Sequence, residues 1–189
     1  IGRAIGLRVP ELRAVTLDAR IARYEADQEV QDVLTASIGL NLGVDFLPGS
    51  FGYDGSAPPS PEEAAKILWL DAFTANIDRT WSNPNLLVWH GRTWAIDHGA
   101  ALYFHHSWPS RGSDPARFAA QPFDASRHVL LEVADDLAPL HDELAAMVGV
   151  ELIDSVLALV PDEWLEPTDS MPDPETVRTA YRLSLLARR

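Results

Sequence analysis

The sequence predicts an α+β fold, in which a mainly helical C-terminal body with an embedded β-hairpin follows a smaller segment that contains strands. Three observations predict it. Alternating apolar residues mark two short stretches before residue 48. Two further short apolar stretches flank a His-Gly pair at residues 90–91. Helical periodicity then continues from about residue 114 to the end of the chain.

The first 47 residues are expected to form the end of a helix, two strands and a hinge. The opening "IGRAIGL" is typical of a last helical turn closed by Gly6, so we expect a chain cut within a helix. The elements that follow are a strand in 10–18, a short helix in 27–37 and a buried strand in 39–49.

A change of composition separates this segment from the body. Residues 48–61, "PGSFGYDGSAPPSP", are rich in Gly, Pro and Ser and are predicted to be a linker. A helix then begins, with Ser60 as N-cap, Pro61 in the first turn and Glu63 completing a capping box. Its buried positions are predicted to be Ile67, Leu70, Ala72 and Phe73.

The body at 62–189 combines a hairpin with several helices. "NLLVW" and "RTWAI" are predicted strands joined by His90-Gly91, where glycine supplies the positive φ of a tight turn. Asp173-Pro174 is a typical helix start. The predicted helices of this half lie in 114–121, 133–149, 150–160 and 173–189.

The composition excludes several classes of protein. Without cysteine the chain has no disulfides or thiolate metal sites, and a cytoplasmic location is expected. No apolar run reaches the roughly 18 residues of a membrane span. The net charge is −13, and residues 129–175 carry 13 acidic side chains but no Lys or Arg. Because such a surface repels phosphate backbones, we expect no direct binding of nucleic acid.

Three polar residues at the ends of the hairpin indicate a chemistry. Asp78 precedes Asn83 by five positions, and Asp97-His98-Gly99 follows the second strand. Because ladder hydrogen bonds hold the strands together, Asn83 and Asp97 should converge opposite the turn. Amide and carboxylate oxygens suit Mg²⁺. The order D-x-x-x-x-N then D-x-G is the one kinases use, with Asp78 acting on the attacking hydroxyl and Asn83 and Asp97 binding the metal.

The same region admits other interpretations. Asp78, Asn83 and Asp97 could simply cap turns or a helix, and Asn85 competes with Asn83 for the metal, although the five-residue spacing favours Asn83. Arg79 could hold a phosphate or pair with a neighbouring carboxylate.

Histidines close to this site suggest a different enzyme. His98, His105 and His106 lie near Asp97 in the sequence, which would suit a mononuclear metal hydrolase. Their spacing matches no established motif, so this remains an alternative.

The residues between 70 and 106, "LDAFTANIDRTWSNPNLLVWHGRTWAIDHGAALYFHH", resemble the catalytic core of the HipA-like kinases. They share the "D-R-x-x-x-N … I-D-x-G" pattern of phosphatidylinositol 3- and 4-kinases, and "GLNLGVDFLPG" resembles the family's fifth strand and hinge. The resemblance implies a protein-kinase-like fold with a partial N-lobe at 1–47 and a C-lobe at 62–189. It also implies ATP and Mg²⁺, with Asp78 as catalytic base and Asn83 and Asp97 as magnesium ligands.

The resemblance further implies an adenine site. Asp45, Phe46 and Leu47 would line it, mostly through backbone groups, and Ile96 would pack beneath the ring. The phosphoryl acceptor would be a hydroxyl of a protein or a small molecule.

The sequence departs from the family in the parts that hold phosphate. Kinases of this type use a phosphate-covering loop and a strand lysine held by a glutamate. The only lysine here is Lys66, four residues after Glu62 on a predicted helix, as in a surface pair. "GSFGYDG" (49–55) does not lie between a strand and a helix. A pseudokinase or a non-catalytic interaction module is therefore the second interpretation.

Overall fold

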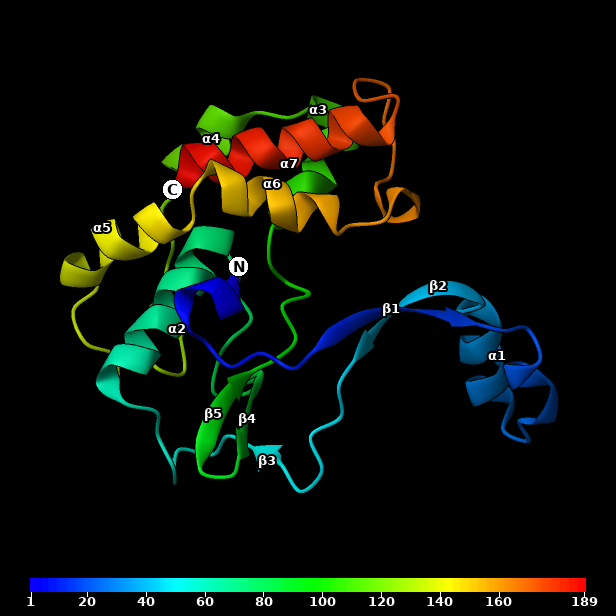
Figure 1. Cartoon of the computed structure of the whole chain (residues 1–189), viewed down its shortest axis with the longest axis horizontal. Helices are drawn as coiled ribbons and strands as arrows, with labels where there is room; N and C mark the ends of the chain where they lie inside the picture. Colours follow the sequence, from blue (N-terminus) through cyan, green and yellow to red (C-terminus); the bar gives the residue numbers. More distant parts are fainter. The chain divides into compact units, whose positions relative to one another are not determined.

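The computed structural model describes all 189 residues apart from the side chain of Ala22. The fold is α+β, as predicted (Figure 1). By contacts the chain divides into two compact units, a smaller one at 10–49 and a larger one that combines 1–9 with 50–189.

The smaller unit is an antiparallel two-stranded ribbon with helical turns between its strands. Strand β1 (Leu12–Leu17) pairs with β2 (Gly39–Val44) over six residue pairs. Between them lie η2 (Ile21–Tyr24) and α1 (Gln28–Ala36). Helix α1 begins where predicted, because the carboxylate of Asp27 accepts hydrogen bonds from the first backbone N–H groups of the helix.

The prediction that the strand within 39–49 is buried is wrong. Leu42 and Val44 on β2 are 54% and 56% exposed, and Leu12, which pairs with Val44, is 45% exposed. Helix α1 buries none of its described residues. The strand pattern was correct, but within residues 10–49 no second layer of structure covers the ribbon.

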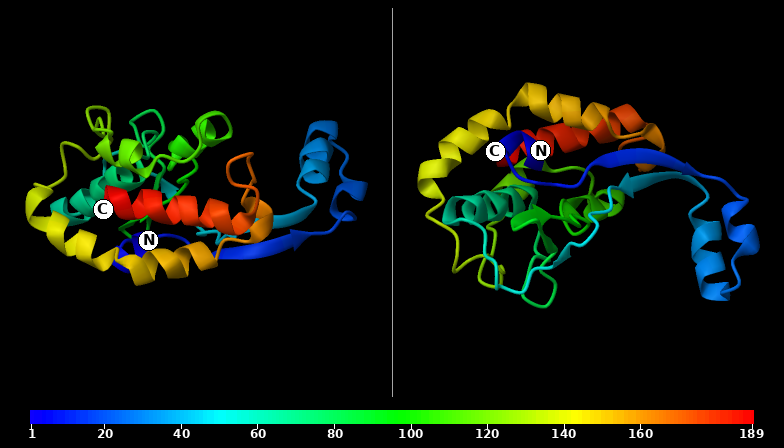
Figure 2. Two further views of the ribbon diagram at one scale, coloured as in Figure 1. Left: turned by 90° about the horizontal axis from the view of Figure 1, so that it is seen from above. Right: turned by 60° about the horizontal axis from the view of Figure 1, so that its bottom comes forward.

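The larger unit holds a short sheet and most of the helices. The sheet has the order β3-β4-β5, all antiparallel, and α7 lies along α6 and α4 (Figures 1 and 2). The elements in chain order are η1 (Gly2–Ile5), β3 (Phe51–Gly52), α2 (Pro61–Thr74), β4 (Leu86–Trp89), β5 (Arg92–Ala95), η3 (Tyr103–Ser107), α3 (Trp108–Arg111), α4 (Pro115–Ala120), α5 (Ala138–Met147), α6 (Val150–Ala158), η4 (Asp162–Trp164) and α7 (Pro174–Arg188).

Helix α2 is the central element of this unit. The hydroxyl of Ser60 accepts the backbone N–H of Glu63, as predicted, but the Glu63 carboxylate does not complete a capping box. It pairs instead with Arg8 at 2.5 Å. Nine residues of α2 are buried, including Ile67, Leu70 and Phe73. At about 1.5–3 kcal/mol for each large apolar side chain, their burial is a main source of the unit's stability.

The hairpin forms as the sequence predicts. His90 and Gly91 have φ values of 49° and 69°, and the two positive values match the right-handed twist of the flanking strands. A third strand was not predicted: β3 pairs Phe51 with Val88, so the predicted linker 48–61 contributes to the sheet.

The C-terminal helices agree with the sequence in number, and the largest difference in their boundaries is at the start of α5. Helix α7 begins with a full capping box between Asp173 and Thr176. Helix α5 begins only at Ala138, whereas the prediction began at 133, because the first turn forms around Pro139. Among the described residues, the helices are too short or too polar to cross a bilayer.

Candidate active site at the base of the hairpin

The loop before β4 brings Asp78 and Asn83 into direct contact. Asn83 Nδ2 donates a hydrogen bond to Asp78 Oδ2 at 2.6 Å. Thr80 and Asn83 exchange two backbone N–H···O bonds of 3.1 Å, which close a tight turn between them. Because the amide nitrogen of Asn83 points to Asp78, its oxygen Oδ1 is directed elsewhere and stays available to a cation.

Arg79 joins this loop to the base of the hairpin. Its Nη1 donates to the carbonyl oxygens of Asn85 and Ile96, and Ile96 N donates to Asn85 O at 3.0 Å. Asp78 is the chain neighbour of Arg79, and Asp97 is the neighbour of Ile96. These hydrogen bonds of Arg79 form a clamp that holds the backbone next to the Asp78 and Asp97 carboxylates. Asn83 lies two residues before Asn85, so the backbone next to Asn83 is held as well.

Arg79 is itself held by a buried carboxylate. Asp71, on α2, accepts Arg79 Nε at 2.5 Å and Nη2 at 3.3 Å, and it also contacts Asn76 Nδ2 at 2.9 Å and His128 Nε2 at 3.0 Å. All four side chains are buried. A buried ion pair is tolerated only when further hydrogen bonds satisfy its polar atoms, and here Asn76 and His128 supply them.

The hydrogen bonds of His128 fix its proton. Leu130 N donates to His128 Nδ1 at 3.2 Å, so Nδ1 is the acceptor and Nε2 carries the hydrogen that points to Asp71. Burial alone would raise the pKa of Asp71, but His128 and the positive charge of Arg79 outweigh it and hold that pKa below its usual 3.8. Asp71 is therefore a carboxylate at neutral pH.

Asp97 lies exposed at the exit of β5. Its φ is 45°, and its Oδ1 accepts the backbone N–H of Gly99 at 3.1 Å. The residue with positive φ in this turn is Asp97 and not Gly99. A Cβ at Gly99 would lie 3.1 Å from Asp97 Oδ1, so a larger residue here would have to displace that carboxylate by a few tenths of an ångström.

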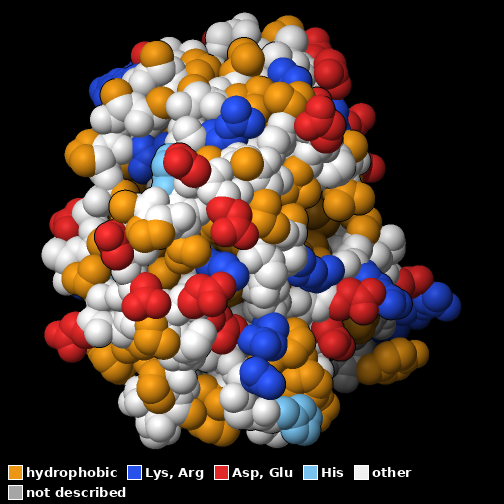
Figure 3. Space-filling model, turned by 60° about the vertical axis from the view of Figure 1, so that its left-hand side comes forward, with side chains coloured by type: hydrophobic (Ala, Val, Ile, Leu, Met, Phe, Trp, Pro, Cys, Tyr) orange, Lys and Arg blue, Asp and Glu red, His pale blue; other side chains and the backbone are white. Residues whose placement is uncertain are grey.

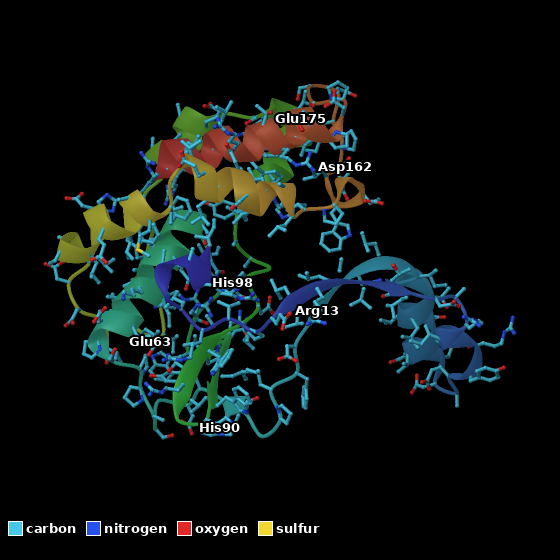
Figure 4. The ribbon with its side chains drawn as sticks, viewed as in Figure 1. Arg13, Glu63, His90, His98, Asp162 and Glu175 are labelled. Carbon is cyan, nitrogen blue, oxygen red and sulfur yellow. The ribbon has the colours of Figure 1, made fainter. Side chains whose placement is uncertain are left out.

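His98 lies on the inner side of the same turn. Figure 4 shows it at the end of the hairpin opposite His90, which marks the tip. Its Nε2 is buried and has no partner among the described residues. Burial, followed by the positive charge of Arg79, lowers the pKa of His98 below its usual 6.5, so the ring is neutral at pH 7.

The residues predicted to line an adenine site fall in both units. Asp45, Phe46 and Leu47 follow β2 in the smaller unit, where Phe46 is 81% exposed and Asp45 N donates to Glu11 O at 2.8 Å. Ile96 belongs to the larger unit and is half-buried in the clamp. The adenine contacts stay a prediction.

The alternative interpretations fare differently. Lys66 pairs with Glu62 at 2.6 Å, as the spacing indicates. The ring of His105 lies 4.2 Å from that of His106, but the described part of the chain contains no group of three or more His, Asp or Glu side chains suited to a metal. A hydrolase centre built from His98, His105 or His106 with Asp97 therefore lacks a ligand set.

The buried network behind the site has only a weak signature in the sequence. Arg79 was expected to be paired or to hold phosphate, and it is paired. Asp71 was not singled out, although an acid on the apolar helix 61–74 is unusual at a buried position. Comparisons of the chain with family models, with curated proteins and with solved structures gave no match.

Proposed function

We propose that this chain is the catalytic region of a HipA-like kinase with a protein-kinase-like fold, which transfers the γ-phosphoryl group of ATP to a hydroxyl acceptor. The observation that supports the proposal is the hydrogen bond between Asp78 and Asn83. Arg79, which follows Asp78, also donates a hydrogen bond to the carbonyl oxygen of Ile96, the residue before Asp97. The loop with Asp78 and Asn83 and the turn with Asp97 thus lie at the same end of the hairpin, as the D-x-x-x-x-N and D-x-G pattern of kinases requires.

The donor atoms fit a magnesium ion. Asn83 Oδ1 and the Asp97 carboxylate are hard oxygens on exposed side chains, which is the kind of ligand that Mg²⁺ binds while keeping several waters. When bound, the ion would neutralise charge on the phosphates of ATP. Asn83 and Asp97 would hold it, and Asp78 would orient the acceptor hydroxyl and receive its proton.

The phosphate-binding parts differ from those of other kinases. Lys66, the only lysine, lies on α2 in an ion pair with Glu62 and is not placed on a strand. This observation favours a second candidate, a pseudokinase that binds nucleotide or a partner without transferring phosphate. The phosphoryl acceptor of the kinase would be a hydroxyl of a protein or of a small molecule.

Two measurements on the same protein test the proposal. ATP binding with and without Mg²⁺ is measured by calorimetry, and phosphoryl release or transfer is followed with γ-labelled ATP. Asp97→Asn should abolish the magnesium-dependent part of binding. Asp78→Asn should keep binding but lower turnover by about 10²–10⁴-fold, the usual contribution of a general base.

The chain offers a matched control. Asp124 is an exposed acid whose carboxylate accepts the backbone N–H of Ser126, two residues on, as Asp97 accepts that of Gly99. Asp124→Asn should change neither quantity. Binding without turnover in the wild type would support the pseudokinase, and an Asp97→Asn protein that binds ATP like the wild type would contradict both readings of the site.

A further inference from the structure

A pocket on the larger unit has no role in the proposed reaction. Its volume is about 420 Å³, and it is formed by η3, α3, α4 and the turns between them. Its floor is aromatic and buried, made of Phe104, Trp108 and Phe118. Tyr103, Arg111 and Arg117 line it from more exposed positions. The volume lies within the range of pockets that hold small molecules.

The two arginines of this pocket differ from most others in the larger unit. Several other arginines of this unit are satisfied: Arg8, Arg178 and Arg182 pair with carboxylates, and Arg188 donates to backbone carbonyls. Among the described residues, the guanidinium groups of Arg111 and Arg117 have neither an ion pair nor a hydrogen bond.

The one carboxylate at the pocket is already in use. Asp114 accepts the backbone N–H of Arg117 at 3.0 Å as the N-cap of α4, and it forms no ion pair with Arg111 or Arg117. In a chain of net charge −13, two arginines at one pocket thus lack an acidic partner. Guanidinium groups so placed are free to bind an anion through two parallel N–H···O bonds.

The aromatic floor of the pocket is held in place by contacts between its rings and by hydrogen bonds around them. The rings of Phe104 and Phe118 have centroids 4.0 Å apart, and those of Phe104 and Trp108 are 5.5 Å apart. Arg188 lies over the Phe118 ring and donates to Phe118 O and Gln121 O, which fixes the end of α4. Tyr103 Oη donates to Gln121 Oε1 at 3.4 Å. A pocket already ordered in this way loses little entropy when a ligand enters.

We propose that this pocket binds a small phosphate monoester whose organic part is a flat ring. The phosphate would lie between Arg111 and Arg117, and the ring would contact Tyr103 and the aromatic floor. A phosphate dianion matches two guanidinium groups better than a carboxylate does, because it offers three oxygens and nearly two charges near pH 7. The inference is independent of the proposed kinase activity.

Phenyl phosphate is the probe that tests the proposal, measured by calorimetry and by the NMR shift of the Trp108 indole N–H. We expect saturable binding that shifts this signal. Phenol, which lacks the charge, and inorganic phosphate, which lacks the ring, should each bind at least about tenfold more weakly, since each loses one class of contact. Benzoate should also bind more weakly.

Substitutions of the two arginines test whether phenyl phosphate binds in this pocket. The double variant Arg111→Gln with Arg117→Gln should weaken phenyl phosphate by about tenfold or more, because two charge-assisted hydrogen bonds are lost. Arg92→Gln alters an exposed arginine of the hairpin that has no ion pair among the described residues, and it should have no effect. Equal binding by the double variant, equal binding of benzoate, or no saturation below about 10 mM would each overturn the proposal.

Discussion

At the scale of single residues, the site depends on a side chain that touches none of its catalytic candidates. Asp71 neutralises Arg79, and Arg79 joins the hairpin base to the Asp78 loop. In Asp71→Asn the arginine keeps its charge in a buried position without a carboxylate. We expect this change to cost about 3–5 kcal/mol of unfolding free energy, as measured by urea denaturation.

An exposed ion pair provides the comparison. Asp154 bonds Arg182 at 2.5 Å, but both side chains are more than a third exposed. Because solvent screens such pairs, Asp154→Asn should cost about 0–1 kcal/mol. If the two variants lose equal stability, the buried network does not organise the hairpin base.

Asp71 and Asp154 look alike in the sequence, so sequence reasoning could not tell the buried aspartate from the exposed one. The spacing pattern singled out Asp78 and Asn83, which lie five residues apart in one loop and are in contact. The Asp71–Arg79–His128 network unites a helix, a loop and a residue 57 positions away from Asp71. Only the packing of α2 against the later chain brings them together, and no local pattern encodes that distance.

A second residue-scale prediction concerns pH. Burial, and then the charge of His106, lower the pKa of His105 below its usual 6.5. At a pH between the lowered pKa of His105 in the folded chain and the usual pKa in the unfolded chain, only the unfolded chain binds the proton. The free energy of unfolding therefore falls as the pH drops below about 6.5.

The melting temperature at about pH 7.5 and about pH 5.5 measures this effect. The difference should shrink in His105→Gln, whatever the variant loses in packing at both pH values. His90→Gln, at the exposed hairpin tip, should leave the difference unchanged. A pH dependence in His105→Gln that equals that of the wild type would assign the effect to other groups.

At the scale of elements, local chemistry decided which predictions succeeded. The hairpin turn, the Ser60 start of α2 and the Asp173 start of α7 were predicted because the residues that form them are adjacent in the sequence. Strand β3 was missed because Phe51–Gly52 is two residues long and stands in a glycine- and proline-rich stretch. Its pairing with β4 is a tertiary contact with no periodic signal.

The hairpin turn yields an element-scale prediction. Gly91 has a φ of 69°, a conformation that costs residues with a Cβ about 1–2 kcal/mol. Gly91→Ala should therefore destabilise the larger unit by about that amount in thermal or urea unfolding. Gly52→Ala is the matched change on β3, where an added Cβ meets no atom within 4 Å. It should be neutral or raise stability by up to about 1 kcal/mol.

At the scale of the whole molecule, the charges on the visible face are mixed, whereas burial is distributed unevenly between the two units. On the face seen in Figure 3, acidic side chains lie scattered among basic and apolar ones. The buried core clusters are drawn from the larger unit alone. In the smaller unit, ten large apolar side chains are exposed: Leu12, Val15, Ile21, Tyr24, Val30, Val33, Ile38, Leu42, Val44 and Phe46. We therefore expect the smaller unit to be less stable than the larger one.

Two antiparallel ribbons in the same chain test this difference. In the β4–β5 ribbon, Leu86, Val88, Thr93 and Ala95 are buried, whereas the β1–β2 ribbon has six residue pairs but no covered face within its unit. An isolated two-stranded ribbon is marginally stable in water. Hydrogen exchange followed by mass spectrometry should show residues 12–44 exchanging at the earliest labelling times, while 86–95 and α2 stay protected. Equal protection of the two ribbons would show that the smaller unit is stabilised by contacts outside residues 10–49.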